Sequence, residues 1–358
     1  LNGDIVVDSI GQVGFDPGSA WNNNGVSTQN DTIRRKPGIT AGDTNPGDAF
    51  DPSVEWESFG NNTFAGLGSI GDVMPPPPVF ARISAVQGSG DSSPLAGAMV
   101  TIEGIVVGDF QNNGGADSGD LSGFYVQEED IDADGDASTS EGIFVFDGGG
   151  TVDVEVGDLV RVSGEAKEFS GLTEIDADQV SVLSSGEPLP AEILLMLPLA
   201  GVDQLEAFEG MRVRFPQDLV ISEYFNFDRF GEIVLALPFA GETRPMTPTA
   251  VELPGSAEYL ARLDANQRSR ITLDDGRTGP NPDPARHPNG AVFDLSNRFR
   301  GGDLVQDASG IMDDRFGAYR LQPTAGANHI IANPRPELPP FIDADIRVAS
   351  FNVLNYFT

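Results

Sequence analysis

The chain has 358 residues and a formal net charge of −34, because 55 acidic residues face only 21 lysines and arginines. A surface this acidic repels nucleic acid at long range and favours divalent cations as partners. The absence of cysteine excludes disulfide bonds and thiolate metal sites, and the length predicts two or three domains.

The residue composition predicts an all-β protein. Glycine occurs 43 times and proline 26 times, and the short β-branched runs between them are typical of strands joined by turns. No apolar run reaches the roughly 18 residues of a membrane-spanning helix, so we expect no membrane span. The sequence begins at Leu1 without a methionine or a signal peptide, and we interpret it as a processed or trimmed part of a longer chain.

Two proline-rich segments divide the chain. GDVMPPPP ends at residue 78, and ANPRPELPPF begins at residue 332. Consecutive prolines favour the stiff polyproline conformation of a spacer. The predicted divisions are a domain over 1–70, a linker over 71–78, β domains over 79–190 and 191–331, a linker over 332–345 and a tail over 346–358.

A basic run lies in the first of these divisions. Arg34, Arg35 and Lys36 follow one another in IRRKPG, and such a cluster is a candidate for contact with nucleic-acid phosphates. A second group of arginines, between residues 262 and 300, has aspartates interleaved with it. Local ion pairs are the better interpretation of that second group.

The middle of the chain contains an internal repeat. GDLVRVSG at 157–164 recurs as GDLVQDASG at 302–310, with one insertion. Three flanking segments recur in the same order: GAMVTIEGIVV and EGMRVRFPQDLVI, GIFVFDGGG and RITLDDGR, and EFSGLTEI and RFGAYRLQ. Two tandem five-stranded barrels explain all four correspondences, and a chance match in a Gly- and Asp-rich chain is the alternative.

The acidic stretch EEDIDADGDASTSE, at 128–141, has the spacing D-x-D-x-D-G-x5-E of a calcium loop. Gly135 stands where such a loop turns sharply, and the carboxylates supply the oxygens that Ca²⁺ prefers. The predicted ligands are Asp130, Asp132, Asp134, Asp136, Ser138 and Glu141. Strand-like GFYVQ and GIFVF flank the loop, so we expect a structural calcium site at the tip of a β-hairpin. A solvated acidic turn is the alternative.

Few other features indicate chemistry. The only two histidines are His287 and His329, and no HExxH, GxSxG or Walker-type motif is present. His287 lies in a Pro/Gly loop, where we expect a local hydrogen bond. The strongest helical pattern is SAEYLARLDANQRS at 256–269, with Leu260 and Leu263 on one face.

Three stretches resemble one family of proteins. The segments DTIRRKP, DAFDPSVEW and FAGLG resemble the last strands of a lamin-tail domain in secreted bacterial nucleases. Residues 79–186 resemble the OB-like domain that follows it there. IRVASFNVLNYFT, at 346–358, looks like the first strand of an endonuclease/exonuclease/phosphatase domain. The order of these parts is more specific than any part alone.

The resemblance implies the non-catalytic part of a secreted nuclease that degrades extracellular DNA. It implies a truncated, Ig-like lamin-tail sandwich followed by two tandem OB-like barrels. Asn352 matches the active-site asparagine of the first nuclease strand, and the remaining catalytic residues would follow Thr358. That absent domain would use Mg²⁺ or Mn²⁺, and the barrels would hold the catalytic domain or the DNA.

Two hypotheses therefore remain open. The first is this accessory region, and the second is a calcium-stabilised extracellular structural or adhesive module that pairs through strand edges. In the first case, stacking on DNA bases would involve Phe124 and Tyr125, or Tyr224, Phe225 and Phe227. Packing in the core is the better interpretation of these aromatic residues, and the charge of −34 favours docking over tight DNA binding.

Overall fold

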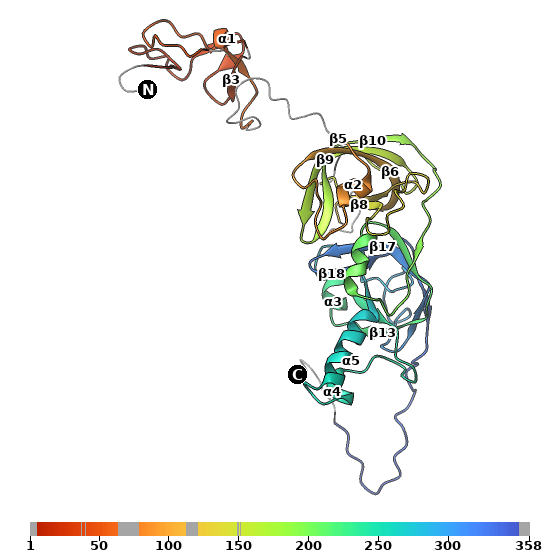
Figure 1. The fold of residues 1–358 in the computed structure, drawn as a ribbon. Coiled ribbons are helices and arrows are strands. Elements are labelled where there is room, and N and C mark those ends of the chain that lie inside the picture. The colour runs from red at the N-terminus through yellow and green to blue at the C-terminus, as the bar shows by residue number, and fades with distance from the viewer. Residues whose placement is uncertain are drawn as a thin grey trace. The chain divides into compact units, whose positions relative to one another are not determined.

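The computed structural model describes residues 6–36, 38–39, 41–63, 79–111, 121–148, 150 and 152–350 (Figure 1). The chain divides into two compact units, Leu1–Phe80 and Ala81–Thr358. Strands far outnumber helices among the described residues, which confirms the all-β class. The whole predicted linker at 71–78 and the candidate residue Asn352 lie outside the described residues.

The first unit contains short pieces of sheet. Strands β1 (Asn22–Asn23) and β2 (Val26–Ser27) pair with each other, as do β3 (Ile33–Arg35) and β4 (Trp56–Ser58). The one-turn helix α1 (Pro52–Glu55) begins at Asp51, whose side chain accepts a hydrogen bond from the Ser53 amide. Strand β5 (Val79–Phe80) ends the unit.

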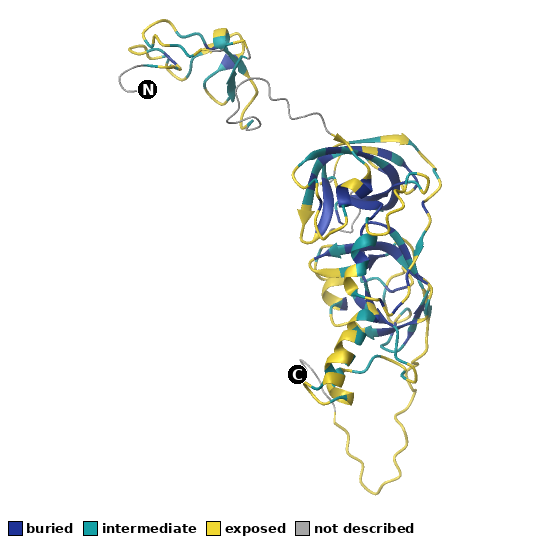
Figure 2. Cartoon of the chain, in the orientation of Figure 1, coloured by how far each residue is buried: buried dark blue, intermediate teal, exposed yellow. Residues whose placement is uncertain are grey.

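The second unit begins with helix α2 (Ile83–Gln87) and a five-stranded ring. Its strands are β6 (Met99–Phe110), β7 (Gly123–Gln127), β8 (Gly142–Phe146), β9 (Leu159–Phe169) and β10 (Leu172–Ser184). The pairing order β6-β7-β8-β10-β9 closes because β9 pairs back with β6. Only β8 and β10 pair in parallel. Apolar residues such as Ile102 and Val126 form the core of this ring, and Figure 2 shows that much of its strands is buried.

A second ring follows along the chain. Its strands are β11 (Ile193–Leu194), β12 (Arg212–Phe215), β13 (Leu219–Glu223), β14 (Ile233–Ala236), β15 (Arg270–Leu273), β16 (Leu304–Gln306), β17 (Ala308–Arg315), β18 (Ala318–Gln322) and β19 (Asn328–Ile330). The helices are the 3₁₀ helix η1 (Val202–Phe208), α3 (Phe227–Phe230), α4 (Pro248–Val251) and α5 (Ala257–Arg268). A separate apolar core, with Val213 and Phe215, lies inside this ring.

The two rings have the same order of strand pairing. Strands β12 and β13 together correspond to β6, and β16 and β17 together correspond to β9. In each ring the third strand, β8 or β15, pairs in parallel with the fifth, β10 or β18. The four corresponding segments in the sequence fall on these corresponding strands. The internal repeat in the sequence is therefore a repeat of strand pairing, and we call the two rings the first and second barrels.

A buried network joins the two barrels. Tyr125 on β7 donates a short hydrogen bond to Asp313 on β17 and accepts one of 2.8 Å from Arg315. The Arg315 guanidinium also lies 2.8 Å from Asp313 and 4.3 Å from the ring centroid of Phe144. Ile311 packs beside them in an apolar cluster supplied mainly by the first barrel. The two barrels are thus parts of one packed unit.

The predicted helix at 256–269 is confirmed as α5, but its apolar face is not buried. Ser256 caps the helix by accepting a hydrogen bond from the Tyr259 amide. Leu260 is 57% exposed and Leu263 is 38% exposed, although their spacing is that of a core-facing stripe. No helix in the described part of the chain is long and apolar enough to cross a membrane.

Candidate metal centre

The acidic loop at 128–141 lies between β7 and β8, as predicted, and its first two aspartates face protein donors. Asp130 accepts a hydrogen bond of 3.0 Å from the Ala191 amide. Asp132 forms an ion pair of 3.1 Å with Arg82, whose guanidinium also donates to the Asp132 carbonyl at 2.7 Å. Both carboxylates are therefore engaged outside the loop.

The remaining predicted ligands contact one another within the loop. Asp134 accepts from the Asp136 amide at 2.7 Å, and Asp136 accepts from both the amide and the hydroxyl of Ser138. Glu141 accepts from the Asp134 amide at 2.8 Å. These donors stabilise the charged forms and lower the pKa of Asp134 and of Asp136.

Two features of the loop fit a cation and one does not. Gly135 has a φ of 77°, the left-handed turn expected at the sixth position. One carboxylate oxygen of Glu141, Oε2, is buried without a hydrogen-bond partner. However, within the described residues no three of the loop carboxylates lie within 4.8 Å of one another. Calcium binding would require Asp130 and Asp132 to leave Ala191 and Arg82, and the loop site stays a prediction.

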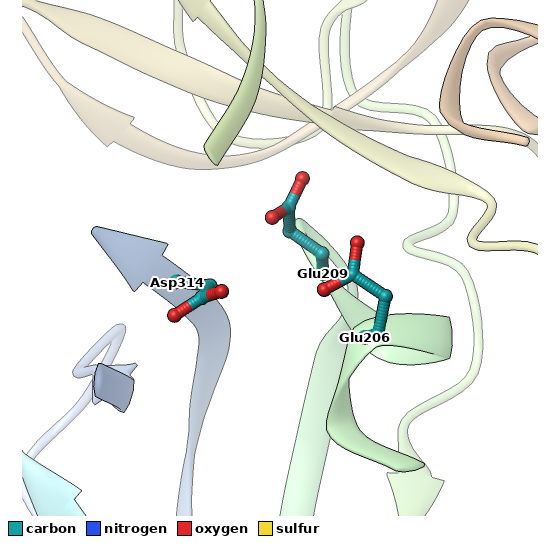
Figure 3. Close-up of side chains that lie close together, drawn as sticks. All are labelled: Glu206, Glu209 and Asp314. Atoms are coloured by element: carbon teal, nitrogen blue, oxygen red, sulfur yellow. The ribbon is translucent and has the colours of Figure 1, made fainter. Parts of the chain in front are cut away.

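The structure instead brings three other carboxylates together. Oxygens of Glu206, Glu209 and Asp314 all lie within 4.8 Å of one another, which we call the interface cluster. Glu206 lies on η1 and Glu209 directly follows that helix, whereas Asp314 lies on β17 and points toward both glutamates (Figure 3). Among the residues that the structure describes, no other group of three metal-ligating side chains meets this distance limit.

Glu209 connects the interface cluster to the first barrel. Its Oε1 accepts hydrogen bonds from the Thr173 amide on β10, at 3.0 Å, and from the Gln87 side chain on α2, at 3.2 Å. Its Oε2 is buried without any hydrogen-bond partner, and the residue is only 1% exposed. Leaving a buried charged oxygen unpaired is costly, so this atom is the strongest sign of a missing ligand.

The charge of Arg320 lowers the pKa of Asp314 and so compensates this negative charge only in part. No lysine, arginine or histidine in the described ranges forms an ion pair with any member of the interface cluster. Burial raises the pKa of Glu209 well above its usual value. Burial also raises the pKa of Glu206 and of Asp314, and the charge of the exposed Asp91 adds to both shifts.

The spacing of the sequence does not reveal this cluster. Glu206 and Glu209 lie three positions apart in QLEAFEG, and Asp314 follows about a hundred residues later. The pair at i and i+3 is a weak signal, because glutamates at that spacing are common on solvated helical turns. The one sequence signal that these two segments lie close together is the internal repeat, which assigns 209–223 and 302–315 to the same barrel.

The predicted phosphate-binding residues are occupied by local contacts. Arg35 pairs with Asp8 at 2.7 Å and with Glu55 at 3.2 Å. The Arg34 guanidinium lies 4.2 Å from the ring centroid of Phe59, and the Lys36 ammonium donates to two backbone carbonyls. In this arrangement the basic run stabilises the first unit.

The aromatic and histidine predictions have clear outcomes. Phe124 and Tyr125 are fully buried, which confirms core packing, whereas Tyr224 is 52% and Phe225 85% exposed. His287 Nδ1 accepts the expected local hydrogen bond from the Asn289 amide.

Tyr224 and Phe225 border an open pocket of about 830 Å³ that is also lined by Arg244 and Arg300.

Comparisons with known proteins identify no relative. No protein-family model matches the chain, and no curated protein matches it. The resemblance to secreted nucleases therefore rests on the three quoted stretches and their order.

Proposed function

We propose that the chain is the non-catalytic accessory region of a secreted, divalent-metal-dependent endonuclease that degrades extracellular DNA. The single observation that carries the accessory role is the buried network of Tyr125, Asp313 and Arg315, which joins two barrels of the same pairing order. A pair joined in this way moves as one rigid support, which suits the positioning of a catalytic domain. The nuclease assignment rests on the order of the three resembling stretches.

In this proposal both barrels are OB-like, and the first unit is the end of a lamin-tail domain. Five strands closed into a barrel with a Greek-key order are typical of OB folds, and each barrel closes from five such strands or pairs of strands. The short paired strands β1–β4 would then be the last strands of an Ig-like sandwich. Asn352 would belong to the catalytic domain, together with Mg²⁺ or Mn²⁺.

The accessory region acts chiefly by docking its own catalytic domain. A charge of −34 opposes tight contact with DNA phosphates, and Arg34, Arg35 and Lys36 are engaged locally. The place best suited to weak contact with a DNA strand is the pocket of Tyr224 and Phe225. Exposed aromatic rings beside arginines provide the stacking surface that single-stranded nucleic acids use.

The experiment compares this 358-residue chain with the natural protein extended past Thr358. In magnesium and calcium, the extended protein is expected to degrade plasmid DNA and the 358-residue chain to leave it intact. Arg315→Ala in the extended protein should lower DNA degradation by loosening the barrel pair, while Arg82→Ala serves as the exposed matched control. Intact DNA after incubation with the extended protein would overturn the nuclease proposal.

The second candidate is a calcium-stabilised extracellular structural or adhesive module. The observation in its favour is that β11 and β19 stand at the two ends of the nine-strand pairing order, each with a single partner strand. Such edges are available for pairing between copies. Sedimentation of the chain across a concentration series tests it, because edge pairing predicts assemblies that grow with concentration.

A further inference from the structure

We propose that the interface cluster of Glu206, Glu209 and Asp314 is a binding site for a hard divalent cation, of which Ca²⁺ is the best fit. The cation would hold η1 to β17 within the second barrel, beside the residues of the first barrel that Glu209 contacts. The site is distinct from the predicted loop at 128–141, and the proposal stands whether or not the chain belongs to a nuclease.

The geometry meets the first requirement of such a site. One oxygen from each of the three side chains lies within 4.8 Å of the others. Oxygens that each lie about 2.3–2.6 Å from a Ca²⁺ ion are separated from one another by up to about twice that distance. The side chains come from two segments, η1 with its following residue and β17, that the barrel fold holds beside each other (Figure 3).

The unpaired oxygen of Glu209 is a separate observation that indicates a ligand. The Thr173 amide and the Gln87 side chain satisfy Oε1, but Oε2 has no partner although the residue is 1% exposed. Nearly all buried polar atoms in proteins are paired, so an exception calls for an unseen water or ion. A neighbourhood of three carboxylates favours a cation over a neutral water.

The surrounding charges strengthen the attraction for a cation. Asp91 and Glu168 add negative potential at Glu206. The Arg315 guanidinium is already engaged by Asp313 and Tyr125. Arg320 acts on Asp314 with the opposite sign, but its ion pairs are with Glu232 and Asp274. Tyr319 donates a hydrogen bond of 2.8 Å to Glu206 Oε2 and so holds one ligand in place. An outer-shell donor of this kind orients a metal-ligating carboxylate.

The ligand chemistry selects the class of ion. Carboxylate oxygens suit Mg²⁺, Ca²⁺ and Mn²⁺, whereas the softer transition metals prefer nitrogen and sulfur ligands. Mg²⁺ keeps most of its water and usually takes one or two carboxylates, whereas Ca²⁺ accepts several carboxylates in irregular arrangements. Three carboxylates on different elements therefore favour Ca²⁺.

The position of the site determines what the ion does. Glu209 contacts both β10 and α2 of the first barrel. The backbone at Gly171, in the turn before β10, comes so close to β17 that a Cβ added there would lie 3.1 Å from the Asp314 carbonyl oxygen. Without a cation, the three carboxylates repel one another where the barrels meet. With a cation, the same three groups hold η1 and β17 together beneath the β9–β10 turn.

Calorimetric titration of the chelator-treated 358-residue chain tests the proposal, with CaCl₂ as the ligand and MgCl₂ as the comparison. The decisive variant is Glu206→Gln with Asp314→Asn, which keeps side-chain size and removes two ligand charges. Loss of an outer partner already weakens metal affinity about 10–100-fold, so losing two ligands should weaken calcium binding at this site by about 100-fold or more. Asp91→Asn, which removes a nearby charge but no ligand, is the matched control and should keep the site.

Thermal unfolding provides a second test, because the difference in Tm between the wild type and the double variant should change sign between calcium and EGTA. Calcium should raise the Tm of the wild-type chain, and the double variant should respond less. In EGTA the double variant should melt above the wild type, because the repulsion among the carboxylates is gone. A purely structural acidic cluster would not produce this reversal.

A milder variant keeps the test decisive if the double variant does not fold. Tb³⁺ binds oxygen-rich calcium sites and emits when a nearby tyrosine is excited, and Tyr319 is bonded to a proposed ligand. Tyr319→Phe should lower this emission, whereas Tyr259→Phe on α5 should not. Equal emission from both variants, or calcium binding by the double variant that equals that of the wild type, would overturn the proposal.

Discussion

The loop at 128–141 and the interface cluster are both acidic, but they satisfy their charges in opposite ways. In the loop, amides, hydroxyls and Arg82 donate to the carboxylates, and the pKa of Asp134 and of Asp136 is lowered. In the cluster, burial raises the pKa of all three members, and one oxygen of Glu209 has no donor. Each region has one buried carboxylate oxygen without a donor, on Glu141 and on Glu209, so the difference lies in how many donors surround the other carboxylates.

The largest expected effect is the loss of stability when an ion pair in the buried interface is broken, compared with the loss when an ion pair of the loop is broken. Arg315→Ala leaves Asp313 buried without its ion-pair partner and should lower the free energy of unfolding by about 3–5 kcal/mol. Arg82→Ala removes a half-exposed guanidinium that pairs with Asp132 and, at 3.5 Å, with the buried Glu128, and it should cost less stability than Arg315→Ala. Urea denaturation of both variants measures the difference, and equal losses would break the comparison.

Asp274 is a buried carboxylate outside both regions, and it predicts how the stability of the protein depends on pH when burial raises a pKa. Burial raises the pKa of Asp274 from 3.8 to about 7, against the opposing charge of Arg320, and Asp275 and Asp313 add to the rise. The folded protein therefore holds a proton that the unfolded chain releases. The stability from this residue is present below about pH 4 and is lost as the pH rises toward 7.

Each pKa unit of such a shift corresponds to about 1.4 kcal/mol, so the expected change across this pH range is a few kcal/mol. Asp274→Asn cannot titrate and should flatten the dependence, while its contact with Gln322 is kept. Urea denaturation at a series of pH values measures the slope. A variant slope as steep as that of the wild type would show that other groups cause it, such as the buried Glu174.

The loop prediction has its own calcium test. If the spacing reports a true site, calorimetry should resolve a second bound Ca²⁺ that Asp132→Ala removes and that Glu206→Gln with Asp314→Asn leaves in place. EGTA should then lower the Tm of the double variant, because only the loop site remains in it. Asp132→Ala binding as much calcium as the wild type would show that the loop is a solvated acidic turn.

The smallest expected effect concerns contact with DNA. Phe225 is 85% exposed, so Phe225→Ala should leave stability within about 0.5 kcal/mol. It should weaken the binding of a single-stranded oligonucleotide by about 1 kcal/mol, the lower end of the stacking range. Leu253→Ala, at a site 78% exposed and outside the pocket of Tyr224, is the matched control. If Phe225→Ala leaves oligonucleotide binding unchanged, the barrels act by docking the catalytic domain and not by contacting DNA through this pocket.

Local sequence patterns determined the secondary structure and the order of the barrels. Glycine, proline and the short β-branched runs between them predicted strands and turns, and the recurrence of GDLV with its flanking segments predicted two units of one kind. The spacing of Leu260 and Leu263 predicted α5. These features were accessible because each depends on residues close together in the chain.

Contacts between distant segments depended on the tertiary structure alone. The exposure of Leu260, the burial of Tyr125 against Arg315 and the meeting of Glu206 with Asp314 all follow from which strand lies beside which. A carboxylate carries the same charge on a solvated turn and in an interface. Its environment, which only the packed barrels create, decides whether that charge is already balanced or requires a cation.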